Sequence, residues 1–211
     1  MRHRLPLLDV AAASMHAQRV SLASDYESTL LGALAEARGH MSCEKGCASC
    51  CYYPISISLL EGRRLFTALV DSGRWTPSLK RKCQTLSERL IALAPQVWLL
   101  SMTPCPLLDD ANACMAYEER PFYCRTALAT DGSEGCHPHR TLENRGPFPR
   151  TDALEEFRKV EGQEMQKLGV SRVLVPIATA LLVAERVEAE GCDIERAYDF
   201  VFKSYEKARH P

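Results

Sequence analysis

Four cysteines stand within nine residues of this chain, at Cys43, Cys47, Cys50 and Cys51. Thiols this close in sequence cannot pair freely with one another, because a disulfide requires a narrow range of Cα separations and Cβ directions. Thiolates gathered in one small volume are what a soft metal ion or an iron–sulfur cluster requires. The nine residues therefore predict a metal centre.

A second group of cysteines follows, at Cys105, Cys114 and Cys124. Two residues separate Cys47 from Cys50, which allows a tight turn with both sulfur atoms on one side. Adjacent side chains such as those of Cys50 and Cys51 point in different directions, so the two thiols cannot easily bind the same small ion. Seven thiols also exceed the four ligands of a tetrahedral zinc site. The spacing leaves open a polynuclear site, two sites, or another role for one of the adjacent pair.

Composition and charge favour a cytoplasmic protein. The formal net charge of −1 over 211 residues gives no electrostatic footprint for nucleic acid or an anionic membrane. The basic start, residues 1–4, precedes an apolar run too short for a signal peptide. The most apolar segment, residues 173–184, contains Pro176 and is well below the roughly 20 residues that span a bilayer. In a reducing compartment, clustered cysteines are expected to be ligands rather than disulfides.

Periodic apolar residues predict a mainly α-helical fold, a helical bundle on both sides of the cysteine region. They indicate helices over residues 8–38, 58–70, 76–93, 152–168, 171–190 and from 193 onward. Ser58 and Glu61 form a capping-box pattern at one start, and Thr76-Pro77 marks another. Asp193 is a good cap for the last helix.

Prolines and glycines punctuate residues 94–150, which we predict to be largely loop, with one helical turn over residues 115–120. A loop of this length inside a compact domain requires a tether, and metal coordination by its cysteines would supply one. We therefore predict a single domain over residues 1–211. Its cysteine core spans residues 43–126, with helical flanks over residues 1–42 and 151–211.

The cysteine motif resembles a known family. Cys43 to Cys51, Cys105-Pro-Leu-Leu-Asp, Cys114-x-x-Tyr-Glu-x-Arg-Pro and Cys124-Arg125 together resemble the YkgJ-type cysteine cluster proteins, also called the CxxCxxCC or zinc- or iron-chelating family. The resemblance covers residues 43–126 and implies a metal-binding domain that holds zinc or iron. A similar domain occurs in flagellin lysine N-methylases, where an iron–sulfur cluster is implicated. By motif position, the implied ligands are Cys43, Cys47, Cys50, Cys51, Cys105, Cys114 and Cys124.

Further cysteines and histidines lie outside this motif. Cys136, His137 and His139 could complete a site, since thiolate and imidazole both bind zinc and iron, and whether they are ligands stays open. We expect Cys83 to be a buried structural cysteine inside a helix, far from other thiols. Cys192 lies at a predicted turn and is expected to take no part in the metal site.

Two arginines flank Cys124. A fixed guanidinium at Arg120 or Arg125 would stabilise nearby thiolates and raise the reduction potential of a cluster. The alternative is that these arginines pair with Glu118 or Glu119 and hold the loop.

The spacing of the first three cysteines is shared with radical S-adenosylmethionine enzymes, but two features disfavour that class. Ser49 stands where those enzymes usually carry an aromatic residue, and the chain shows almost no strands.

The preferred function is an iron–sulfur protein, with a 4Fe–4S cluster as one form, in a redox or protein-modifying role. The alternative is a non-catalytic module in which zinc stabilises a surface for a protein partner. The sequence does not decide whether the protein is an enzyme.

Overall fold

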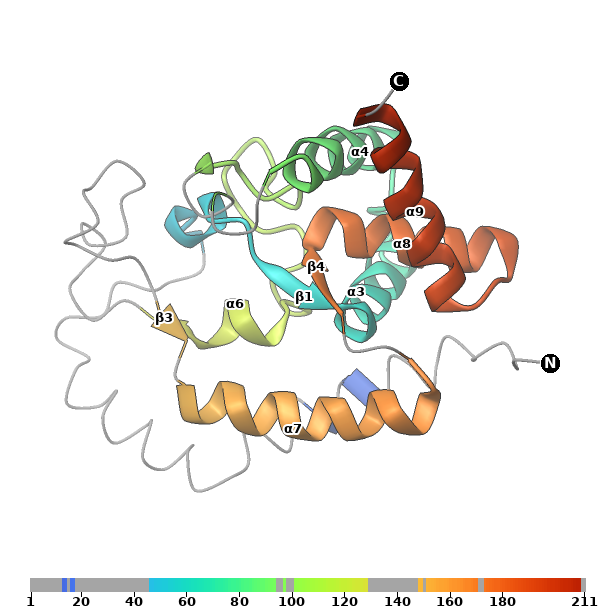
Figure 1. Cartoon of the computed structure of the whole chain (residues 1–211). Coiled ribbons are helices and arrows are strands. Elements are labelled where there is room, and N and C mark those ends of the chain that lie inside the picture. The colour runs from blue at the N-terminus through green and yellow to red at the C-terminus, as the bar shows by residue number, and fades with distance from the viewer. Residues whose placement is uncertain are drawn as a thin grey trace, which may run out of the picture.

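The computed structural model describes residues 13–14, 16–17, 46–93, 97, 101–128, 148–149, 151–170 and 173–209. Within these ranges the protein is mainly α-helical, as predicted, with two small two-stranded antiparallel sheets (Figure 1). Cys43 and residues 136–139 lie outside the described residues. So does most of the helix predicted over residues 8–38, of which residues 13–14 and 16–17 are helical.

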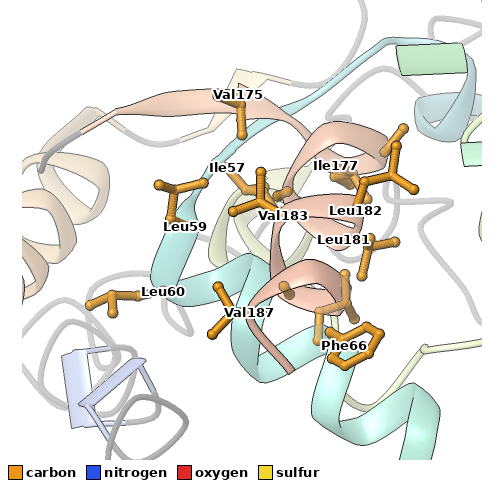
Figure 2. Packing of buried hydrophobic residues seen from close by; sticks show 14 of the residues in the cluster. Ile57, Leu59, Leu60, Phe66, Val175, Ile177, Leu181, Leu182, Val183 and Val187 are labelled. Carbon is orange, nitrogen blue, oxygen red and sulfur yellow. The ribbon is translucent and has the colours of Figure 1, made fainter. Parts of the chain in front are cut away.

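Helix α8 lies at the centre of the core (Figure 1). The core helices are α3 (Leu59–Asp71), α4 (Pro77–Ile91), α8 (Ile177–Glu190) and α9 (Ile194–Arg209). Every residue from Ile177 to Ala184 is buried, and a helix that is apolar on all sides must be covered on all sides. Helices α3, α4 and α9 pack against it. Figure 2 shows Leu181 and Val187 of α8 and Phe66 of α3 in the same buried cluster.

A short antiparallel pair of strands lies before the two main core helices. Strand β1 (Ser56–Ser58) pairs with β4 (Leu174–Pro176), with Ile57 opposite Val175. β1 leads directly into α3 and β4 leads directly into α8, so the pairing fixes the starts of both helices together. Both facing side chains are buried in the core (Figure 2).

The prediction of one helix over residues 171–190 was wrong at its start, because residues 174–176 form β4. The physical reason is Pro176, which pushes Val175 toward extended backbone and lacks the N–H that a helix interior would need. The helix begins one residue after the proline and ends, as predicted, before Gly191, whose φ of 63° is left-handed.

The caps predicted from the side chains of Ser58, Thr76 and Asp193 are confirmed. Ser58, Thr76 and Asp193 each accept a backbone N–H three residues further on, at 3.1, 3.2 and 2.8 Å. Ser58 has a second role, because its hydroxyl donates to the buried Glu161 Oε1 at 2.5 Å. Glu161 belongs to α7 (Thr151–Leu168), so one hydroxyl joins β1, α3 and α7.

The middle of the chain contains more regular structure than predicted. The helical turn expected over residues 115–120 is a series of turns, and the helix starts after Pro121. This helix is α6 (Phe122–Thr126), and β2 (Ala127–Leu128) and β3 (Phe148–Pro149) form the second sheet. Phe122 stacks on Phe157 of α7, with ring centroids 4.3 Å apart. This contact packs α6 against α7 (Figure 1).

No helix in the described part of the chain is both long enough and apolar enough to cross a membrane.

Helix α3 lies directly against α8 at Gly62. A Cβ added there would be 2.5 Å from the Cβ of Ala180. We expect Gly62→Ala to lower the free energy of unfolding by about 1–3 kcal/mol through overpacking, despite the better helix propensity of alanine. Urea denaturation measures this change. The double variant Gly62→Ala/Ala180→Gly should recover most of the loss, and a single variant as stable as the parent would contradict this packing.

Candidate metal centre

Six of the seven predicted cysteines line one small cavity of about 60 Å³. They come from three segments, namely η1 (Ser49–Tyr52) with the residues just before it, the loop over residues 101–121, and α6. The six are Cys47, Cys50, Cys51, Cys105, Cys114 and Cys124. All six are free thiols and partly buried. The structure therefore brings together residues that are up to 77 positions apart, 124 minus 47.

Backbone hydrogen bonds attach the loop to the first cysteine segment. The N–H of Cys105 donates to the carbonyl of Cys51 at 2.7 Å. Leu108 and Cys114 form an isolated antiparallel bridge, and the N–H of Met115 donates to Leu107 O at 2.9 Å. The loop therefore folds back on itself and returns Cys114 to the same end as Cys105.

Two buried side chains of α3 hold the segment that leads to Cys124. Glu61 Oε1 accepts the backbone N–H of Phe122 at 2.7 Å. Arg64 Nη1 donates to Glu119 Oε2 at 2.6 Å, and its Nη2 donates to the carbonyls of Glu119 and Arg120 at 2.7 and 3.1 Å. Both α3 side chains are 3% exposed. The core helix thus sets the backbone position of the third cysteine segment.

Sequence reasoning missed this role of α3, although a signal was present. Glu61 stands four residues before Leu65, so it falls on the apolar face of the helix, and Arg64 stands four residues after Leu60. Charged residues on a buried face require partners, because an unpaired buried charge is very costly. Their position therefore indicates that another part of the chain supplies these partners.

Arg120 lines the same cavity as the thiols. Its guanidinium lies 3.8 Å from the centroid of the Tyr117 ring, and its Nε donates to Tyr117 O at 2.9 Å. Arg125 Nε donates to Arg120 O at 2.9 Å, and Arg125 also donates to Glu118 O. Both arginines therefore bind backbone carbonyls, while the Glu119 carboxylate pairs with Arg64. The structure places a fixed cation beside the thiols.

The adjacent pair Cys50 and Cys51 is electrostatically asymmetric. The pKa of Cys50 is lowered to about 7, mainly by a hydrogen bond from the Cys51 thiol and also by the Arg120 charge, against the effect of burial. The same hydrogen bond, together with burial, raises the pKa of Cys51. Cys50 therefore loses its proton more readily than Cys51 does.

The remaining cavity thiols favour the neutral form. Burial raises the pKa of Cys105 to about 12 and is also the main cause of the raised pKa values of Cys114 and Cys124. A metal ligand must be the thiolate, so metal binding here displaces protons and is stronger at higher pH.

The cavity offers sulfur donors. Its lining in the described part of the chain contains six thiols and neither a histidine nor a carboxylate. Soft thiolate ligands suit zinc and iron–sulfur clusters. Among the residues described, no group of three or more His, Cys, Asp or Glu side chains stands in an arrangement that could hold a metal ion.

The two cysteines expected to lie apart from the site do not line the cavity. Cys83 is fully buried on α4, as predicted, but it lies closer to the other thiols than expected. Burial raises its pKa, and the Cys105 charge adds to this shift. Cys192 lies between α8 and α9, with its Sγ 4.0 Å from the carbonyl of Arg186.

The helical scaffold and the thiol-lined cavity together form a cysteine-rich domain. Residues 42–146 match the model of the CxxCxxCC family, which is described as a "putative zinc- or iron-chelating domain". This match confirms the resemblance found in the sequence. No curated protein and no solved structure matches the chain.

Removal of the Glu61 carboxylate should destabilise the fold. Glu61→Ala leaves the buried N–H of Phe122 without this acceptor, which costs about 1–3 kcal/mol. Glu61→Gln keeps an oxygen acceptor and should lose less. Urea unfolding of the metal-free protein measures both. Asp199→Ala removes an exposed ion pair with Lys203 and should change stability by less than about 1 kcal/mol. Equal losses for Glu61→Ala and Asp199→Ala would contradict the role of Glu61.

Cys50 should react faster with iodoacetamide than Cys51 or Cys105 in the metal-free, reduced protein, because the thiolate is the nucleophile. Its labelling rate should rise with pH with a midpoint near its pKa of about 7. Cys51→Ala removes the hydrogen-bond donor and should move this midpoint upward, and Arg120→Gln should move it upward by less. Peptide mass spectrometry reads the labelling. A midpoint that is unchanged in Cys51→Ala would contradict the pairing of the two thiols.

Proposed function

We propose that the cysteine cavity holds an iron–sulfur cluster and that the protein acts in a redox or protein-modifying role. The observation that carries this proposal is the donor set. Six thiols surround one cavity whose described lining holds neither a histidine nor a carboxylate, and six is more than the four ligands that one zinc ion takes. Iron–sulfur clusters are held by cysteine thiolates.

The proposed ligand set includes the residue that lies outside the structural description. The candidates are Cys43, Cys47, Cys50, Cys51, Cys105, Cys114 and Cys124. A cluster would supply electron transfer or an open iron site. The chain would hold the thiolates, exclude water through the buried side of the cavity, and offset their negative charge with the Arg120 guanidinium. Loading is expected to draw the sulfur atoms together around the centre.

Zinc is the second candidate, because thiolates bind zinc as well as iron and the family model is described as zinc- or iron-chelating. In this case the metal would stabilise the loop over residues 101–121 and present a surface to a protein partner without catalysis.

Anaerobic purification followed by an absorption spectrum and elemental analysis separates the two functions. A cluster predicts several irons per chain and broad visible absorption from thiolate-to-iron charge transfer. A colourless protein with stoichiometric zinc would contradict the iron–sulfur proposal and support the second candidate.

Ligand assignment is tested by substitution. Cys124→Ser should lose most of the bound metal and lower the stability of the loaded protein, because α6 then supplies no thiolate to the cavity. Cys192→Ser is the matched control and should keep its metal, since Cys192 does not line the cavity. Cys83→Ser is expected to keep its metal as well. Metal content of Cys124→Ser equal to that of the parent would refute its assignment.

A further inference from the structure

A second, larger cavity of about 660 Å³ opens between α4 and the loop over residues 103–112. Its volume lies within the roughly 300–1,000 Å³ that is typical of small-molecule sites. Cys105 and Leu86 line both this groove and the cysteine cavity, so the two spaces share a wall. The proposed metal function makes no use of this groove.

Three cations of α4 face the groove. Arg81, Lys82 and Arg89 line it together with Thr85, so they follow one face of the helix over two turns. All three cations are exposed, and none forms an ion pair with another residue of the described ranges. Like charges along one helix face repel each other, and an anion in the groove would relieve this repulsion.

The acidic residues across the groove neutralise these cations only in part. Asp109 Oδ1 already accepts the backbone N–H groups of Ala111 and Ala113 at 2.9 and 2.8 Å, which fixes this carboxylate in the turn. Asp110 is the other acid in the described lining. Three cations therefore face two acids, one of which is held by its own loop, and the groove keeps an excess of positive charge.

The remaining lining is suited to an organic ligand. Leu86, Leu108 and Pro106 supply apolar surface, and Tyr52 supplies a ring. Apolar walls with a few convergent polar groups are the usual composition of a small-molecule site. Arg81 and Arg89 are eight positions apart on α4, which corresponds to about 12 Å along the helix axis. A ligand with two or more separated anionic groups matches this spacing better than a single anion does.

We propose that the groove between α4 and the loop over residues 103–112 binds a small organic polyanion, with phosphate or carboxylate groups that pair with Arg81, Lys82 and Arg89. A molecule bound there lies against the wall formed by Cys105. Its position beside a metal centre rests on the proposed function, whereas its binding to the groove does not.

Isothermal titration of the full-length protein tests this proposal, with tripolyphosphate as the phosphate probe and citrate as the carboxylate probe. Each titration is made with metal-free and metal-loaded protein. We expect at least one probe to bind, more weakly at higher salt. The probe that binds more tightly identifies the preferred anionic group. Binding of neither probe would overturn the proposal. A protein that binds no metal would contradict the proposed function. The titrations of the metal-free protein would then test anion binding to the groove by themselves.

Charge-removing variants locate the binding. Arg81→Gln/Arg89→Gln should weaken binding by at least about tenfold, because two charge-assisted contacts are lost. The control Lys159→Gln/Lys203→Gln removes the same charge from exposed positions on α7 and α9 and should change affinity by less than about twofold. Circular dichroism checks that both variants keep their helices. Equal weakening in the two double variants would show a general charge effect and overturn the assignment to the groove.

Discussion

The arrangement of the thiols depends on the Arg64 guanidinium, which is buried in the core and reaches out to the loop. Burial is the main cause of its lowered pKa, and Glu61 and Glu119 oppose that shift. A buried charge of this kind is tolerated only when its partners are fixed. The partners here include the backbone carbonyls of Glu119 and Arg120, directly before α6. Because burying Arg64 without these partners is costly, the native fold forms only with this segment in place.

The helical core and the cysteine segments therefore have different roles in the molecule. Helices α3, α4, α8 and α9 supply most of the buried apolar core. The cysteine segments have little regular structure and are held by hydrogen bonds from α3 and from each other. A loop that is positioned by a rigid scaffold is the usual place for a functional site. The scaffold here fixes the backbone of the thiols and leaves their side chains partly accessible.

Much of this organisation could be predicted from the sequence, because its signals are local. Ser58 and Thr76 mark helix starts through their own side chains, and the cysteine motif identifies the family. The strand at Val175 was missed because its partner is more than a hundred residues away, and periodicity reports only local pattern. The interactions of Arg64 were missed for the same reason. The groove along α4 was missed because a row of exposed cations in sequence does not show what faces it.

The double contact of Ser58 has a consequence for how the protein unfolds. The same hydroxyl accepts the backbone N–H of Glu61 in the first turn of α3 and donates to Glu161 of α7. Separation of α7 from α3 breaks the hydrogen bond between Ser58 and Glu161, and α3 carries the side chains that hold the loop. We therefore expect hydrogen exchange in α7, α3 and the cysteine segments to follow one opening event. Two helices a hundred residues apart would then belong to one cooperative unit.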